Sequence, residues 1–240
     1  MGRLGRTWIH FPDDTEWQIG AKISEKSDYL AAEDYPDELQ TDISESQAVY
    51  HCCQTAGPEA GRAGMMKIRM QVPTEFPASD NRKERTREAR IDLGPWTVQE
   101  IDNLSYLNER GCSVTPRLLT WDYLLQNQEM LIPGGYIAIL VMEILPGVSL
   151  DHFWEYDLEK REKIRAAFRL ALTELFSHNA SPADKRLPNI HYDEGNDKRY
   201  ILGYEDVHIP HLGGKPVTWT DSQYFYWDLA YRSFNGEENF

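Results

Sequence analysis

The order of the regularly patterned segments constrains the fold of this chain more than any other feature of its sequence. Residues 47–53 and 63–72 are rich in β-branched, aromatic and methionine residues and flank a stretch with glycine and proline, which is typical of two antiparallel strands joined by a loop. Residues 118–125 and 136–143 are also strand-like, and Pro133-Gly134-Gly135 supplies a turn between them. The sequence therefore predicts two antiparallel strand pairs.

Helical spacing occurs between the two strand pairs and again after the second pair. Pro95 begins the first predicted helix, and Gly111 follows its last turn. Asp157 is placed to cap a longer helix over residues 158–177, which carries one apolar stripe. The apolar positions of the first helix recur every three residues and are Val98, Ile101, Leu104 and Leu107. Strand pairs combined with two packed helices predict an α+β protein.

The remaining segments are patterned more weakly. Residues 12–46 are acidic and interrupted by prolines, which predicts irregular structure with room for one strand, and the mixed charges of residues 73–94 predict a solvated linker. Residues 189–192 and 199–202 flank a turn-forming run and predict a hairpin. A last helix is predicted over residues 221–234. The aromatic residues near it are expected in a core, with the tyrosines alternatively lining a cleft for a flat ligand: Trp219, Tyr224, Tyr226, Trp227 and Tyr231.

Composition and charge disfavour several classes of partner. Asp and Glu outnumber Lys and Arg by 39 to 25, so the net charge of −14 would repel a nucleic-acid backbone. The longest apolar stretch, residues 136–142, is far shorter than the about 20 residues that a membrane-spanning helix needs. The first residues have no apolar core typical of a secretory signal, so we expect a cytoplasmic protein. Cys52, Cys53 and Cys112 lack zinc-ligand spacing and are expected to be buried or idle thiols.

Four polar residues are spaced in a recognisable way. Lys67 lies in the second predicted strand, Glu100 lies in the helix that follows, and Asp184 and Asn189 enclose four residues later in the chain. With the order of the segments, this spacing resembles the fungal branch of the aminoglycoside-phosphotransferase-like kinases over about residues 47–210. No single motif is specific, but their order and spacing together are.

The resemblance implies a two-lobed, protein-kinase-like fold of the α+β class with a reduced C-terminal lobe. Residues 1–145 would form the N-terminal lobe, with an irregular acidic segment, an antiparallel sheet and one helix. Residues 146–240 would form the helical C-terminal lobe. Residues 139–150 look like the hinge between the lobes, whose backbone normally holds adenine, and this places Glu143 among the ligand-binding residues.

The resemblance also implies roles for the four polar residues. Lys67 would hold phosphate and pair with Glu100, Asp184 would be the catalytic base, and Asn189 would occupy a metal-ligand position. A structural interpretation stays open beside each role. Lys67 and Glu100 would then be a structural ion pair, and Asp184 and Asn189 would stabilise their loop through hydrogen bonds.

Three positions depart from the family pattern. Pro182 stands where the family has a histidine, and Gly203 stands where it has the metal-binding aspartate. Residues 42–47 contain two carboxylates and no glycine, where a glycine-rich loop would approach phosphate. Losing one preorganised electrostatic stabiliser costs about 3–4 kcal/mol of transition-state stabilisation, so ordinary phosphoryl transfer is expected to be impaired.

Three functions are therefore considered. The first is a kinase-fold protein that binds a small organic molecule in the interlobe cleft, without cofactor or metal, and acts on it with Asp184 as acid or base and Lys67 as a charge-stabilising group. The second is an active small-molecule phosphotransferase with ATP and Mg²⁺, which uses Asp206 and Asn189 as metal ligands. The third is a pseudokinase scaffold that binds a protein partner. In the first, the expected ligand-binding residues are Glu100, Asn189 and Glu143.

Overall fold

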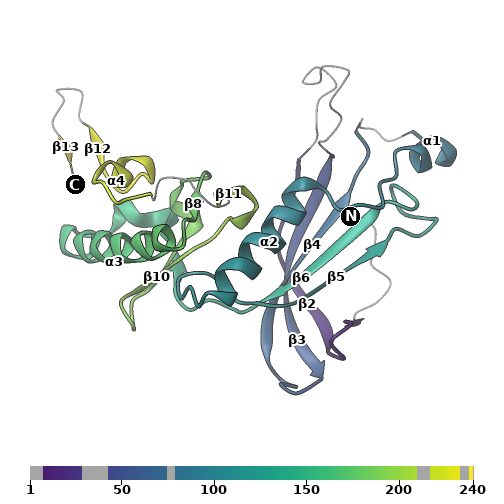
Figure 1. Ribbon diagram of the computed structural model, residues 1–240, viewed down its shortest axis with the longest axis horizontal. Helices are drawn as coiled ribbons and strands as arrows, with labels where there is room; N and C mark the ends of the chain where they lie inside the picture. Colours follow the sequence, from purple (N-terminus) through teal and green to yellow (C-terminus); the bar gives the residue numbers. More distant parts are fainter. Residues whose placement is uncertain (1–7, 29–42, 75–78, 210–216, 233–237, 240) are drawn as a thin grey trace. The chain divides into compact units, whose positions relative to one another are not determined.

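The computed structural model describes residues 8–28, 43–74, 79–209, 217–232 and 238–239 (Figure 1). The chain divides into two compact units. The first contains the described residues up to Val98 together with Leu118–Ile144, and the second contains Gln99–Arg117 and the described residues from Leu145 onward. Residues 99–117 belong to the second unit, so this division does not follow a single boundary along the chain. The antiparallel sheet of the first unit and the long helix of the second confirm the α+β class.

A six-stranded antiparallel sheet with the strand order β1-β2-β3-β4-β6-β5 forms the first unit. Its strands are β1 (Trp8–His10), β2 (Glu16–Asp28), β3 (Glu45–Ala56), β4 (Ala63–Gln71), β5 (Leu118–Leu125) and β6 (Tyr136–Met142). Both predicted strand pairs are confirmed, as β3 with β4 and β5 with β6. Pairing of β4 with β6 then joins them into one sheet.

Strand β2 is the main difference from the sequence expectation in this unit. The sequence predicts mostly irregular structure over residues 12–46, but β2 is 13 residues long and pairs with β3 from end to end. Register shifts interrupt that pairing between Ile19 and Ser24. Because each such shift changes the face toward which the following side chains point, the apolar alternation in the sequence is broken. Trp17 is nevertheless a core residue, at 2% exposure.

Alternation along β4 decides which side chains face the core. Met66, Ile68 and Met70 belong to the apolar cluster of the first unit. Successive side chains of a strand point to opposite faces, so Lys67 and Arg69 share the other face. Both are also buried. The strand therefore places two buried cations side by side on the face away from the apolar cluster.

Two helices lie between β4 and β5 in the chain. Helix α1 (Arg82–Arg87) lies within the predicted solvated linker and has no buried residue, but its helical structure was not predicted. The side chain of Asn81 caps it by accepting a hydrogen bond from the backbone N–H of Lys83 at 3.1 Å. Helix α2 (Pro95–Glu109) is confirmed over its predicted range. Three of its four predicted apolar positions are buried, and Val98 is exposed.

Helix α3 (Leu158–Ser177) is the longest helix of the second unit and begins and ends as predicted. The Asp157 carboxylate accepts a hydrogen bond from the backbone N–H of Lys160 at 2.8 Å, which satisfies one free donor of the first turn. Strands β9 (Ile190–Asp193) and β10 (Lys198–Ile201) form the predicted hairpin. No helix in the described part of the chain is long and apolar enough to cross a membrane.

The other elements of the second unit are short. They are β7 (Val148–Ser149), η2 (Leu150–Glu155), β8 (Ser181–Pro182), η3 (Leu187–Asn189), η4 (Tyr204–Asp206), β11 (Val207–His208), α4 (Ser222–Tyr226), β12 (Tyr231–Arg232) and β13 (Glu238–Asn239). Those labelled η are 3₁₀ helices. Strand β7 extends the β9–β10 hairpin into a three-stranded sheet, and β8 pairs with β11.

Helix α4 is much shorter than the predicted C-terminal helix. Asp228, two residues beyond its end, has a left-handed backbone with φ 55°, which an α-helix cannot continue through. The aromatic residues are accordingly divided. Trp227 is fully buried as predicted, but Tyr226 and Tyr231 are more than half exposed, so the expectation of a common aromatic core is wrong for these two.

Candidate functional site

The loop that carries Asp184 is held at its base by backbone hydrogen bonds. Strand β8 precedes the loop and pairs with β11. Beyond that pair, the N–H of Ala183 donates to the carbonyl of Asp206 at 2.8 Å. At the other end, η3 leads directly into β9. The backbone position of Asp184 is therefore fixed from both sides within the second unit.

Asp184 and Asn189 are brought together, as their spacing suggests. The side-chain amide of Asn189 donates to the Asp184 carboxylate oxygen Oδ2 at 2.9 Å and to the Asp184 backbone carbonyl at 3.0 Å. One amide group thus fixes both the loop backbone and the orientation of the carboxylate. This geometry agrees with either interpretation of the pair, and their predicted chemical roles stay predictions.

Arg186 is a member of this site that sequence reasoning missed. Its Nη2 lies 2.7 Å from Oδ2 of Asp184, and the side chains of Arg186 and Asp184 are 54% and 36% exposed. No hydrogen bond from the described residues reaches the other oxygen, Oδ1 of Asp184. The carboxylate is therefore oriented through one oxygen, and the second oxygen has no hydrogen bond from the described residues to hold it.

Gly203 stands where the family has its metal-binding aspartate, and its local conformation favours glycine. Gly203 has a left-handed backbone with φ 83°, and a Cβ added to it would lie 3.0 Å from the side-chain nitrogen of Asn189. The N–H of the preceding Leu202 donates to the carbonyl of Asn189 at 2.8 Å, which holds the two segments together. Any residue with a Cβ would be strained there. Glycine is therefore the residue that fits this position with the least strain.

The remaining predicted residues lie elsewhere. Lys67 is buried in β4 of the first unit, and Glu100 is buried in the part of α2 that belongs to the second unit. Their predicted ion pair stays a prediction. Glu143 directly follows β6 and is half-buried. Its assignment to a ligand-binding hinge likewise rests on the resemblance.

A buried polar network in the first unit surrounds Glu45. Glu45, expected in a poor phosphate-binding loop, begins β3 and is buried. One of its carboxylate oxygens lies 3.1 Å from Nη2 of Arg69. The other accepts hydrogen bonds from the hydroxyl of Thr97, at 2.7 Å, and from that of Tyr136. Burial, followed by the charge of Glu45, raises the pKa of Tyr136 well above its usual value.

Comparison with known proteins yields distant structural similarities. No family model matches the sequence, and no curated protein matches it. Among solved structures, the chain is similar to the kinase PK-1 of Cydia pomonella granulovirus, with a TM-score of 0.43 and 16% identity over 84% of this chain and 65% of that chain. It is also similar to monomeric WbdD, with a TM-score of 0.44 and 15% identity over 68% of this chain and 33% of that chain. The chain spans less than two thirds of either protein, and its function is inferred from its own residues.

The residues that sequence reasoning missed had weak signals. Arg186 follows Asp184 by two residues in a short loop, where a cation can turn back onto a carboxylate. Arg69 follows Lys67 by two residues in a strand, which places both on one face. Glu45 had no signal, because its partner became recognisable only once the register of β3 on β4 was known.

Proposed function

We propose that this chain has a two-lobed, kinase-like fold with a reduced C-terminal lobe, and that it binds a small organic molecule at the Asp184 loop and acts on it by acid–base chemistry. The order of the elements along the chain supports the fold part of the proposal. The observation that carries the functional part is the orientation of the Asp184 carboxylate, which has one oxygen held by Asn189 and Arg186 and the other without a partner among the described residues.

This orientation suits proton transfer. A general acid or base must be fixed within hydrogen-bond reach of the substrate, since misplacement lowers the rate steeply. Asn189 and Arg186 fix the Asp184 carboxylate through Oδ2, and Oδ1 is then the atom that would exchange a proton. Arg186 is half exposed, so its guanidinium also offers a donor to an anionic or carbonyl group of the bound molecule. The charge-stabilising role of Lys67 rests on the resemblance alone.

Two observations weigh against ordinary phosphoryl transfer. Gly203 has no carboxylate to hold the principal Mg²⁺ ion, and a Cβ added there would lie 3.0 Å from the side-chain nitrogen of Asn189. Glu45 lies in a buried ion pair within a strand, so the segment that would be a phosphate-binding loop instead enters the sheet directly. Bare backbone N–H groups at a flexible glycine-rich turn are what phosphate binding requires, and a strand that begins there does not offer them.

The phosphotransferase alternative has one observation in its favour. Asp206 is joined to Ala183 by a backbone hydrogen bond of 2.8 Å, and Ala183 precedes Asp184. A second carboxylate residue therefore lies close to the catalytic-loop position, where it would be a candidate ligand for Mg²⁺ together with Asn189.

Nucleotide binding separates the two functions. The full chain is melted with and without millimolar ATP and Mg²⁺, beside the Lys67→Ala variant. A nucleotide present at 100 times its Kd would stabilise the protein by about 2.7 kcal/mol, which raises Tm by several degrees. We expect no such shift. A shift of that size that Lys67→Ala removes would support the phosphotransferase instead.

Catalysis is tested with Asp184→Asn and a matched control, Asp151→Asn, which changes an exposed aspartate of the same unit. Each protein is incubated, in the presence of EDTA, with a mixture of small alcohols, amines and carboxylic acids, and products are followed by mass spectrometry. We expect turnover by the parent chain and by Asp151→Asn, and none by Asp184→Asn. Turnover that persists in Asp184→Asn, or that is lost to EDTA and restored by Mg²⁺, contradicts the proposal.

A further inference from the structure

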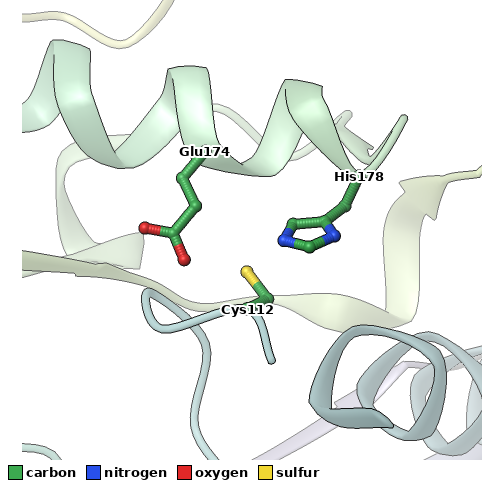
Figure 2. A group of neighbouring side chains, drawn as sticks. All are labelled: Cys112, Glu174 and His178. Atoms are coloured by element: carbon green, nitrogen blue, oxygen red, sulfur yellow. The ribbon is translucent and has the colours of Figure 1, made fainter. Parts of the chain in front are cut away.

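Three side chains with metal-binding atoms converge in the second unit, and none of them is assigned to the proposed reaction. Glu174 and His178 project from the end of α3 toward the sulfur of Cys112, which lies in the segment that follows α2 (Figure 2). One ligand atom from each lies within 4.8 Å of the other two, and no other such group of three occurs in the described part of the chain. The two helical residues are four positions apart, a spacing that places them on the same face of a helix.

The donor set is the kind that zinc selects. Zn²⁺ is bound by cysteine sulfur, histidine nitrogen and carboxylate oxygen, and three protein ligands with one open position are common. Tetrahedral bonds of about 2.3 Å to sulfur and 2.0–2.1 Å to nitrogen or oxygen place the ligand atoms about 3.4–3.6 Å apart. The observed atoms, within 4.8 Å of one another, need to approach by roughly 1 Å, which changes of side-chain rotamer can supply.

Neighbouring groups hold one ligand in place and leave another free. The Glu174 carboxylate accepts hydrogen bonds from the backbone N–H of Ser113 and, at 3.0 Å, from its hydroxyl. Such partners outside the coordination sphere orient metal ligands, and a carboxylate retains further lone pairs for a cation. The imidazole of His178 has no hydrogen bond to the described residues, so a ring nitrogen is available.

A buried hydroxyl without a partner also occurs in the described part of the second unit. The hydroxyl of Tyr204 is buried, with the residue 2% exposed, and it has no hydrogen-bond partner among the described residues. Burial, followed by the charges of Cys112 and Glu174, raises the pKa of Tyr204. Buried polar groups are rarely left without a partner.

We propose that Cys112, Glu174 and His178 form a binding site for a zinc-class divalent cation, with a fourth position open to water. The site would join the segment after α2 to the last turn of α3, both of which belong to the second unit. The cation would bind the cysteine as a thiolate, as zinc sites do. The proposal does not depend on the chemistry of Asp184, and the site is distinct from that loop in sequence and in ligand set.

The test uses Co²⁺ and Zn²⁺ as probes on the full chain. Bound metal is first removed with a chelator, and the chelator is then removed from the protein. Co²⁺ bound by a thiolate gives a charge-transfer absorption, and displacement of Co²⁺ reports the affinity for Zn²⁺. We expect one equivalent of Co²⁺ with that absorption in the parent chain, its loss in Cys112→Ser, and its retention in Cys53→Ser. Cys53 is a matched control because it is a half-buried free thiol in the first unit.

A further variant keeps the test decisive if Cys112→Ser does not fold. His178→Asn removes the imidazole and places at the end of α3 a residue that suits a helix C-terminus. We expect its Zn²⁺ affinity to fall at least tenfold, with the circular dichroism spectrum unchanged. The proposal is overturned if the parent chain lacks the thiolate absorption with Co²⁺, or if folded His178→Asn or Cys112→Ser binds Zn²⁺ as tightly as the parent chain.

Discussion

Replacing Arg69 with Met should destabilise the first unit by about 3–5 kcal/mol, since it leaves the carboxylate of Glu45 buried without its cation. The two side chains are 3% and 6% exposed, and Nη2 of Arg69 lies 3.1 Å from the carboxylate oxygen Oε2. With an effective dielectric constant of about 20, unit charges at that separation attract by about 5 kcal/mol. The cost of removing both charges from water offsets most of this attraction in the native protein. Removing the charge of Arg69 leaves the Glu45 carboxylate with its full cost of burial and without the attraction that offset this cost.

A double variant separates this explanation from a simple loss of packing. Gln in place of Glu45 carries no charge, yet its side-chain oxygen can still accept hydrogen bonds from Thr97 and Tyr136. Arg69→Met/Glu45→Gln should therefore be more stable than Arg69→Met alone by about 1–3 kcal/mol, although it contains one more substitution. If packing alone mattered, the second substitution would give no recovery.

Urea unfolding followed by tryptophan fluorescence and circular dichroism measures these differences. A matched control is the exposed pair of Lys163 and Glu159 on α3, 2.8 Å apart, for which Lys163→Met should leave the unfolding midpoint nearly unchanged. A cost below about 1 kcal/mol for Arg69→Met, or a double variant no more stable than Arg69→Met, would refute the account of a buried charge that needs its partner.

Two further predictions concern glycines. Gly94→Ala should lower stability by about 1–3 kcal/mol, because its Cβ would lie 2.5 Å from a carboxylate oxygen of Glu45. Thermal unfolding measures this loss. The control is Gly195→Ala, whose Cβ has no contact shorter than 3.5 Å and which should unfold as the parent does. Gly203→Ala should cost about 1–2 kcal/mol through its left-handed backbone and press on the side chain of Asn189, and an unchanged Tm would show that the loop tolerates other conformations.

Much of the fold followed from the sequence, because its strands and helices are marked by local chemistry. The strand pairs carry β-branched and apolar residues with turns between them, and α3 has a capping aspartate and a continuous stripe. Two elements were predicted incorrectly, strand β2 and the C-terminal helix, and each error has one physical cause. The bulges in β2 break the alternation from which a strand is recognised, and the left-handed Asp228 ends a helix that the aromatic spacing would continue.

The site was predicted less completely, because spacing reveals only residues that are close in sequence. Asp184 and Asn189 are five positions apart, and the amide of one reaches the carboxylate of the other. Glu45 and Arg69 meet only through the pairing of two strands, and Cys112 meets Glu174 only through tertiary packing. A list of motifs contains no such pairing, so the ion pair and the candidate cation site required coordinates.

The geometry of the Asp184 loop also limits the phosphotransferase alternative. To replace the absent metal ligand by a change of register, Asp206 would have to move to the position of Gly203, a shift of three residues along the chain. That shift would break the hydrogen bond from Ala183 to Asp206 and the pairing of β11 with β8, at about 0.5–1.5 kcal/mol for each hydrogen bond lost. An odd shift also reverses the faces of a strand, so Val207, now fully buried, would turn outward. A change of register that brings Asp206 to the position of Gly203 would therefore remove the pairing that holds the base of the Asp184 loop, whereas the proposed acid–base reaction requires no such rearrangement.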